Sequence, residues 1–274
     1  MKVTTPASSR DFYNTIARYY DAENEEVTAD LELYSALAAD TAEALNADAP
    51  ILDVGCGTGR VMLHLAGEGY QMRGVDSSVA MLERGKRKAK NRIDLADMIK
   101  FYEGNALDFA FPEKYGLILI PYNGFMHFNT AADQRNLLHY LYNWLLDDGL
   151  LAIDLPNAGE TFGTIDDGAV TLERSFVEPE SGHMVMQQSV SALNRTDQLQ
   201  RITWIYDEIH EGGMLQRTVA PLTLRYVFPT EMDLLLELNG FERIARYGDY
   251  DQSPFEEGCE RLIVVARKNA ARRR

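Results

Sequence analysis

The chain has few cysteines, a deficit of basic residues and no long apolar segment. Its 274 residues include two cysteines, Cys56 and Cys259, too few for a disulfide framework or a cysteine zinc site. No apolar run approaches the ~20 residues needed to span a bilayer, and the polar residues 1–10 contain no apolar core of a signal peptide. We therefore expect a cytoplasmic protein that does not enter membranes.

Acidic residues dominate the charge of the chain. Its 42 Asp and Glu outnumber its 27 Lys and Arg, which gives a net charge of −15. Nucleic acids and anionic membrane surfaces require a basic face, so we expect neither as a partner. Hydrophobic residues make up 46% of the chain, enough for a buried core. The length favours one domain with an elaboration over two independent domains.

Residues 51–60, ILDVGCGTGR, form the most informative segment. Ile51–Val54 is typical of a short buried parallel strand, and a helix is expected from Val61. Between them lie three alternating glycines, Gly55, Gly57 and Gly59. A loop without Cβ atoms lets a ligand approach backbone N–H groups and the positive end of a helix. Dinucleotide-binding loops follow G-x-G-x-x-G, whereas here the third glycine comes one position earlier, directly before Arg60.

Two acidic side chains accompany this loop. Asp53 lies on the strand before it, and Asp76 follows the next expected strand, over residues 70–75. A carboxylate at a strand end can accept both ribose hydroxyls of a nucleoside. Alternatively, Ser77 or Ser78 caps the following helix, with Asp76 merely beside it. Together, the glycine spacing and the two acids resemble the first motifs of the class I S-adenosylmethionine-dependent methyltransferases.

The resemblance covers residues 48–155 and 229–268 and implies S-adenosylmethionine as the cofactor. It implies these cofactor-binding residues: Asp53, Gly55, Cys56, Gly57 and Gly59 around the methionine moiety, Asp76 at the ribose, Ser77, Asn105 and Ala106 around the adenine, and Pro121 and Tyr122 beside the transferable methyl group. Asn105 stands where the family usually has an acid, and its amide carbonyl can still accept from an exocyclic amine.

The early segment Tyr19-Tyr20-Asp21 resembles the N-terminal lid of small-molecule N-methyltransferases of this fold, including those acting on glycine or amino sugars. In such a lid an aromatic ring covers the sulfonium, and a tyrosine face suits a cation in a dry pocket. We expect Tyr20 to have this role, on a helix over residues 11–21 with little apolar surface beyond its tyrosines. The alternative is that these tyrosines, with Tyr13, are the packing face of that helix.

Strands and helices alternate along the chain, which predicts an α/β fold with a doubly wound, mostly parallel, seven-stranded Rossmann-like sheet. Residues 168–228 instead contain only strand patterns separated by turns. We expect an N-terminal lid and helices over 1–46, a cofactor-binding core over 47–164 and 229–268, and an inserted antiparallel β subdomain over 165–228. That subdomain either roofs the acceptor pocket or pairs two subunits in a homodimer.

Methyl transfer is an in-line displacement at a sulfonium carbon, for which orientation alone supplies ~7–11 kcal/mol. A neutral amine acceptor needs no strong base, whereas a hydroxyl or an acidic carbon does. The candidate catalytic residues are His127 and Tyr122, on the segment after the fourth strand. The alternative for His127 is a satisfied packing histidine. The other histidines show no metal-ligand spacing, so no metal is expected: His64, His139, His183 and His210.

The sequence therefore predicts an enzyme that transfers a methyl group from S-adenosylmethionine to a small-molecule acceptor, an amine or a hydroxyl. Acidic residues in the loop 247–251 favour a cationic or amine acceptor, and a solvated hairpin loop is the alternative. Two other functions stay open: a non-catalytic S-adenosylmethionine-binding protein and, against the glycine spacing, an NAD(P)-dependent oxidoreductase.

Overall fold

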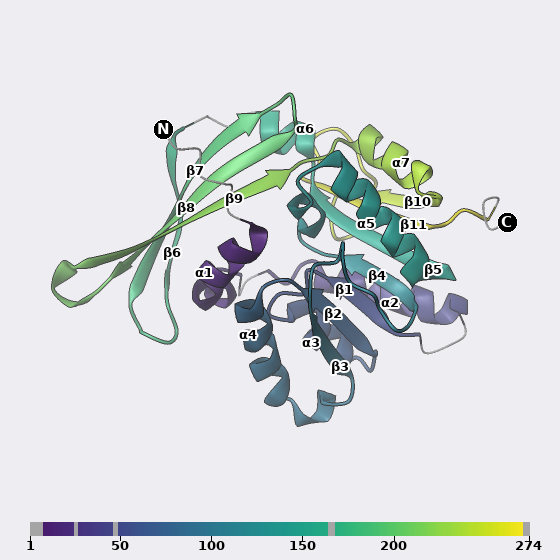
Figure 1. Ribbon diagram of the computed structural model, residues 1–274, viewed down its shortest axis with the longest axis horizontal. Helices are drawn as coiled ribbons and strands as arrows, with labels where there is room; N and C mark the ends of the chain where they lie inside the picture. Colours follow the sequence, from purple (N-terminus) through teal and green to yellow (C-terminus); the bar gives the residue numbers. More distant parts are fainter. Residues whose placement is uncertain (1–7, 25–26, 46–48, 164–167, 271–274) are drawn as a thin grey trace.

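The computed structural model describes residues 8–24, 27–45, 49–163 and 168–270 (Figure 1). The first elements in chain order are α1 (Ser9–Glu23), α2 (Leu31–Leu45), β1 (Ile51–Val54), α3 (Arg60–Gly67), β2 (Met72–Asp76), α4 (Val79–Lys90), β3 (Ile99–Glu103), β4 (Tyr115–Ile120), α5 (Ala131–Trp144), β5 (Leu145–Pro156) and α6 (Ala158–Gly163). They are followed by β6 (Val170–Val177), β7 (Met184–Asn194), β8 (Leu199–Ile209), β9 (Leu215–Arg225), α7 (Pro229–Leu238), β10 (Phe241–Tyr247) and β11 (Arg261–Lys268). Among the described residues, no helix has the length and apolar character to cross a membrane.

The larger sheet has seven strands in the order β10-β11-β5-β4-β1-β2-β3. Neighbours among β1 to β5 are parallel, whereas β11 is antiparallel to both β5 and β10. The strand order reverses beside β1, so the loops after β1 and β4 separate at the carboxyl edge and leave room for a ligand. This arrangement confirms the expected doubly wound, mostly parallel, seven-stranded sheet.

The central strands are buried on both faces, as their continuous apolar sequences require. Every residue of β1 and β4 is buried. In β4, Leu117 and Leu119 face one core cluster with α2 and α3, while Ile118 and Ile120 face another with α5 and α7. Each such side chain contributes ~1.5–3 kcal/mol when fully buried, so the two helical layers hold the strand ends in fixed positions.

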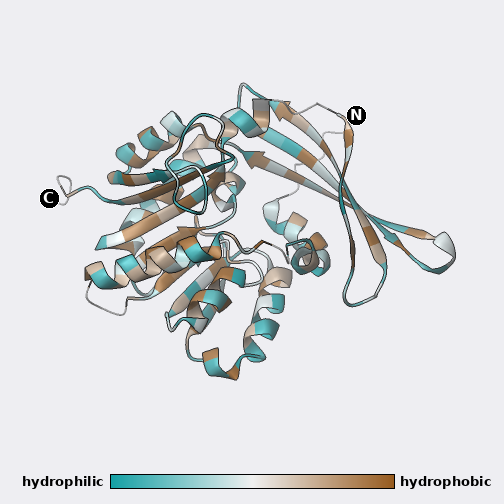
Figure 2. Cartoon of the chain, turned by 180° about the vertical axis from the view of Figure 1, so that it is seen from behind, coloured by the Kyte–Doolittle hydropathy of each residue, from teal (hydrophilic) through white to brown (hydrophobic). Residues whose placement is uncertain are grey.

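The smaller sheet contains β6, β7, β8 and β9 in sequence order, all antiparallel. It is inserted between α6 and α7 and extends to one side of the main sheet (Figure 1). Its strands mix hydrophilic and hydrophobic residues (Figure 2), and Ile202, Tyr206 and Leu222 join the main core. The structure confirms the expected antiparallel insertion, although its expected start at residue 165 lies outside the described residues.

Helix α1 lies between the two sheets, against α4 on one side and β9 on the other (Figures 1 and 2). Phe12, Ile16 and Tyr19 are buried in the core, and the Tyr19 ring stacks on that of Tyr206 at a centroid distance of 4.7 Å. The expectation of little apolar surface on this helix is therefore wrong. Phe12 and Ile16 lie one turn apart on the face that also carries Tyr19, so this helix packs as part of the core.

Candidate functional site

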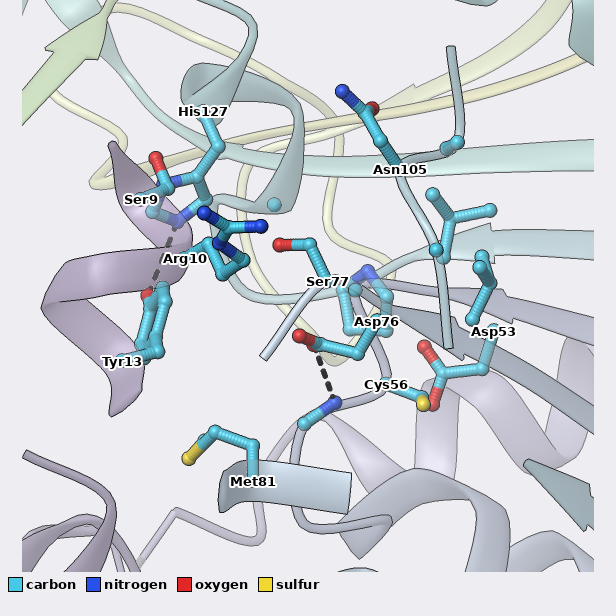
Figure 3. A pocket seen from close by; sticks show the side chains of 18 of the residues that line it. Ser9, Arg10, Tyr13, Asp53, Cys56, Asp76, Ser77, Met81, Asn105 and His127 are labelled. Carbon is cyan, nitrogen blue, oxygen red and sulfur yellow. Dashed lines mark hydrogen bonds between the residues drawn. The ribbon is translucent and has the colours of Figure 1, made fainter. Parts of the chain in front are cut away.

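A cavity of about 570 Å³ opens at the carboxyl edge of the parallel strands (Figure 3). It is lined by the loops after β1, β2, β3 and β4 and by one face of α1. Its size is in the ~300–1,000 Å³ range of small-molecule sites. Among the described residues, none from the inserted sheet lines this cavity. The sheet packs against the side of α1 that faces away from the cavity, and the two alternatives for it, a roof over the acceptor pocket or the pairing of two subunits, stay open.

Most of the sequence-predicted site residues line the cavity: Tyr20, Asp53, Gly55, Cys56, Gly57, Asp76, Ser77, Asn105, Ala106, Pro121, Tyr122 and His127. Gly59 does not. It is the N-cap of α3 with a φ of 78°, and a Cβ atom there would lie 3.0 Å from the Phe101 ring. The ligand contact expected at Gly59 stays a prediction, and in the structure this glycine lets the loop and α3 pack against β3.

The glycine loop has the backbone that its spacing indicates. The φ angles of Gly55 and Gly57 are 79° and 54°, in the left-handed region that favours glycine. A Cβ atom at Gly57 would lie 3.2 Å from the Met81 methyl group. The backbone N–H of Gly57 donates to Asp76 Oδ2 at 2.9 Å, so the loop and the end of β2 are held together.

Asp76 lies at the cavity and also beside a helix cap, so the two alternatives left by the sequence do not exclude each other. Its carboxylate lines the cavity and also accepts from the backbone N–H of Ser78 at 2.7 Å. Ser78 is the N-cap of α4 and accepts from the N–H of Met81 at 3.3 Å. Burial raises the pKa of Asp76, and its backbone hydrogen bonds oppose that rise. The acid is thus fixed in orientation at the strand end where a ribose would reach it.

Asp53 is a buried carboxyl group that lacks a full set of partners. It is 1% exposed, and its Oδ1 atom has no hydrogen-bond partner among the described residues. Burial raises its pKa to about 7. A buried acceptor is costly without a donor, so this atom favours a ligand that brings an ammonium or another N–H group into the cavity.

Asn105 follows β3 at the cavity rim. Its Oδ1 accepts from the backbone N–H of Leu107 at 3.0 Å, which makes a local turn of the kind that Asn often forms. The neighbouring Ala106 is buried. Because one lone pair of Oδ1 is used within the loop, a ligand amine would have to share this oxygen with Leu107.

His127 joins the loop after β4 to helix α1. It ends the short 3₁₀ segment η2 (Gly124–His127), its Nε2 lies 3.1 Å from the Tyr13 hydroxyl, and its Nδ1 lies 3.1 Å from Ser9 Oγ (Figure 3). Burial lowers the pKa of His127 to about 4. The ring is therefore neutral at physiological pH, and both of its nitrogens have partners on α1.

The face of α1 that meets the cavity was only partly predicted. Tyr20 was expected there, but Ser9 and Tyr13 also line the cavity, and the Tyr13 and Tyr20 rings meet edge to face at 6.0 Å. Asn14 anchors this face to the core, because its Oδ1 accepts from Ser78 Oγ at 2.8 Å. The spacing of Ser9, Tyr13 and Tyr20, one and three turns apart on one helix face, is the signal that could have found them.

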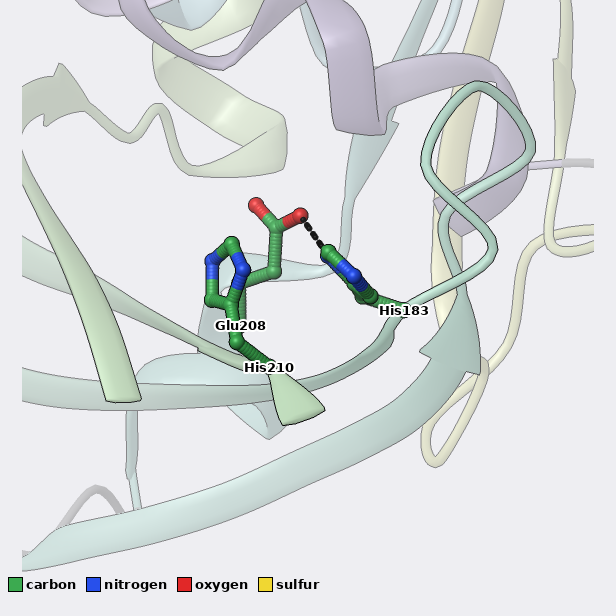
Figure 4. A group of neighbouring side chains, drawn as sticks. All are labelled: His183, Glu208 and His210. Atoms are coloured by element: carbon green, nitrogen blue, oxygen red, sulfur yellow. Dashed lines mark hydrogen bonds and ion pairs between the residues drawn. The ribbon is translucent and has the colours of Figure 1, made fainter. Parts of the chain in front are cut away.

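A histidine cluster lies outside the cavity, on the inserted sheet (Figure 4). The potential ligand atoms of His183, Glu208 and His210 lie within 4.8 Å of one another, because Met184 of β7 pairs with Ile209 of β8. Spacing in the sequence does not reveal this grouping, and the expected absence of a metal stays a prediction.

This cluster already has a positive charge beside its carboxylate. His183 Nδ1 lies 2.9 Å from Glu208 Oε1, and Arg18 of α1 donates to that same oxygen at 3.3 Å and to Glu178 at 2.7 Å. The guanidinium neutralises the carboxylate that a cation would need, so the arrangement serves first to attach α1 to the inserted sheet.

A family model described as a methyltransferase domain matches residues 51–149. A protein of Geobacillus named as a methyltransferase is 31% identical over 38% of this chain, and the match spans 41% of that relative. A glycine/sarcosine N-methyltransferase of Parasynechococcus marenigrum is 27% identical over 75% of this chain and 67% of its own length.

Two solved structures share the fold over nearly the whole chain. The methyltransferase CcbJ of Streptomyces caelestis is 22% identical, with a TM-score of 0.77 over 94% of this chain and 98% of its own. The sugar N-methyltransferase KedS8 of Streptoalloteichus is 19% identical, with a TM-score of 0.71 over 98% of both chains.

Proposed function

Since this chain is a class I S-adenosylmethionine-dependent methyltransferase, we propose that it methylates the nitrogen of a small-molecule amine. The observation that carries the choice of nitrogen is the state of His127. Its pKa is lowered to about 4, and both ring nitrogens have partners on α1. A hydroxyl acceptor needs a base with a pKa near the working pH, and His127 does not provide one. A neutral amine attacks without such a base.

The cavity residues fit the cofactor in this proposal. The free Oδ1 of Asp53 would accept from the ammonium of the methionine moiety, and the fixed carboxylate of Asp76 would accept from the ribose hydroxyls. The Gly55–Gly57 loop leaves space for a close approach, Ser77, Asn105 and Ala106 would border the adenine, and Cys56 is part of the loop. When bound, the cofactor supplies an electrophilic methyl group on a sulfonium.

The protein's own residues then orient the acceptor and exclude water. Tyr20 of α1 would cover the sulfonium with its ring, which suits a cation in a dry site. Pro121 and Tyr122 would flank the methyl group from the loop after β4. Because α1 closes this side of the cavity through Tyr13 and Ser9, the acceptor is held away from bulk water. In this proposal, the alignment of acceptor and methyl group contributes more to the rate than acid–base chemistry.

Two of the similar proteins are named for nitrogen acceptors. One named relative is a glycine/sarcosine N-methyltransferase, and one solved structure is a sugar N-methyltransferase. Both names describe nitrogen acceptors on small molecules, one an amino acid and the other a sugar. They support nitrogen as the acceptor atom in this chain and leave the class of small molecule open to experiment.

The test is a screen for S-adenosylhomocysteine formation with matched acceptor pairs, such as glycine with glycolate and an amino sugar nucleotide with its hydroxyl parent. We expect turnover only with the amine of a pair. Asp76→Ala is the control that must abolish the signal. Methylation of the hydroxyl compound, with none of the amine, would contradict the proposal.

A further inference from the structure

The carboxylate of Asp154, at the end of β5, accepts hydrogen bonds from four other segments. The residue is 1% exposed. Its Oδ2 accepts from the backbone N–H of Tyr122 at 3.1 Å and from the hydroxyls of Tyr34 at 3.2 Å and Tyr250 at 3.0 Å. Its Oδ1 accepts from Arg261 Nε at 3.0 Å and is ion-paired with Arg261 Nη2. Both oxygens therefore have partners, as a buried carboxylate requires.

These donors come from distant parts of the sequence. Tyr34 belongs to α2, Tyr250 to the loop between β10 and β11, and Arg261 to the start of β11. Burial raises the pKa of Asp154, and Arg261 and Tyr250 oppose that rise. Because an unpaired charge is costly in the interior, each donor is held in place around the carboxylate. The backbone of Tyr122 is thereby fixed relative to three other elements.

The turn that contains Tyr122 has an unusual backbone. The φ angles of Tyr122 and Asn123 are 41° and 68°, in the left-handed region, which side-chain-bearing residues adopt only where their surroundings enforce it. The N–H of Asn123 donates to the Asp154 carbonyl at 2.9 Å, and Arg261 Nη2 donates to Asn123 Oδ1 at 2.9 Å. The Arg261 guanidinium also lies 5.9 Å from the centre of the Tyr122 ring.

We infer that Asp154 is a positioning residue for methyl transfer, which holds the Pro121–Asn123 turn so that Tyr122 keeps its place in the cavity wall. Tyr122 lines the cavity and Asp154 does not, so Asp154 acts through the turn. The catalytic consequence rests on the proposed function, whereas the effect on the turn does not. The loop 247–251, for which acceptor contact and a solvated hairpin are the alternatives, contributes Tyr250 to this network.

The variant that tests this is Asp154→Asn, which keeps the shape of the side chain and removes its charge. In either orientation of the amide, its NH₂ group replaces one of the two acceptor oxygens and faces N–H or O–H donors. The matched control is Tyr115→Phe. Tyr115 is 0% exposed, and its hydroxyl has no partner among the described residues, so the loss of this hydroxyl leaves the turn untouched.

The first measurement is the fluorine NMR spectrum of protein with 3-fluorotyrosine at position 122. It needs neither cofactor nor acceptor, so it is independent of the proposed function. We expect one narrow resonance in the unmodified chain and in Tyr115→Phe, and a shifted or broadened one in Asp154→Asn. An unchanged resonance in a folded Asp154→Asn protein would overturn the inference.

The second measurement is a double-mutant cycle with Tyr122→Ala. Alone, Asp154→Asn is expected to lower kcat at least ~10-fold, as a misplaced group does, and to change the Kd of S-adenosylhomocysteine less than about threefold. In the Tyr122→Ala background its effect on kcat should shrink to less than about threefold. Equal losses in both backgrounds would overturn the inference. A chain that binds cofactor but methylates no amine would contradict the proposed function and leave the fluorine result to decide the role of Asp154.

Discussion

Replacing Asp76 by alanine tests the cofactor site most sharply, because this carboxylate holds the glycine loop and is proposed to bind the ribose as well. It accepts from the backbone N–H groups of Gly57 at 2.9 Å and Ser78 at 2.7 Å, and it would also accept from the ribose. The loss of a hydrogen bond to a charged group costs ~2 kcal/mol, which is about a 30-fold weaker affinity. The disturbed loop adds to that loss, so ~2 kcal/mol is a lower bound.

The assay is calorimetric titration with S-adenosylhomocysteine, together with thermal unfolding. Asp76→Ala should bind at least about 30-fold more weakly and also unfold at a lower temperature, because two buried N–H groups lose their acceptor. Asp76→Asn keeps one acceptor oxygen, so it should lose less stability than Asp76→Ala. Comparison of the two variants separates the effect on cofactor affinity from the effect on folding. The matched control is Asp94→Ala, at an exposed acid paired with Arg92. Unchanged affinity in a folded Asp76→Ala protein would refute the ribose role.

Four further results are expected. Gly57→Val should abolish cofactor binding, because a side chain there meets Met81 at 3.2 Å with a φ of 54°, and calorimetry checks this. Tyr20→Ala should weaken S-adenosylmethionine more than S-adenosylhomocysteine, whose sulfur carries no charge, by ~0.5–2 kcal/mol for a lost cation–π contact. Equal losses would contradict a role at the sulfonium. Deletion of residues 1–22 removes Phe12, Ile16 and Tyr19 from the core, and burial of each side chain is worth ~1.5–3 kcal/mol. The truncated chain should therefore melt at a lower temperature or lose its cooperative melting transition. An unchanged transition would make α1 a separable lid. The pKa of His127 is about 4 in the folded chain, below its unfolded value of ~6.5. Its contribution to stability is therefore present above pH ~6.5 and lost as the pH falls toward 4. His127→Gln should flatten the pH dependence of the free energy of urea unfolding in that window, and an identical slope would contradict burial of the neutral ring.

Local patterns were enough to predict the main sheet and the floor of the cavity. Ile51–Val54, the glycine spacing and Asp76 lie close together in the sequence and in space, so strand, loop and acid could be placed from residue order alone. The packing role of Gly59 could not be predicted, because a glycine in such a loop can make room for a ligand or for a neighbouring ring, and the Phe101 ring is distant in the sequence.

The parts that could not be predicted depend on contacts between distant segments. Nothing near Asp154 in the sequence shows that Tyr34 and Arg261 converge on it, since they lie 120 and 107 residues away. The same holds for His183 and His210, which only the pairing of β7 with β8 brings together. The buried face of α1 could not be predicted either, because it packs against the inserted sheet, which lies far away in the sequence.

A crystal structure of the chain with S-adenosylhomocysteine tests directly whether this cavity is the cofactor site. We expect the nucleoside at the carboxyl edge of β1 and β2, with both ribose hydroxyls within hydrogen-bond distance of Asp76 and the amino group beside Asp53 Oδ1. The sulfur should lie between Tyr20 and the Pro121–Tyr122 turn. A ligand bound elsewhere, or in this cavity with its ribose away from Asp76, would contradict the central claim.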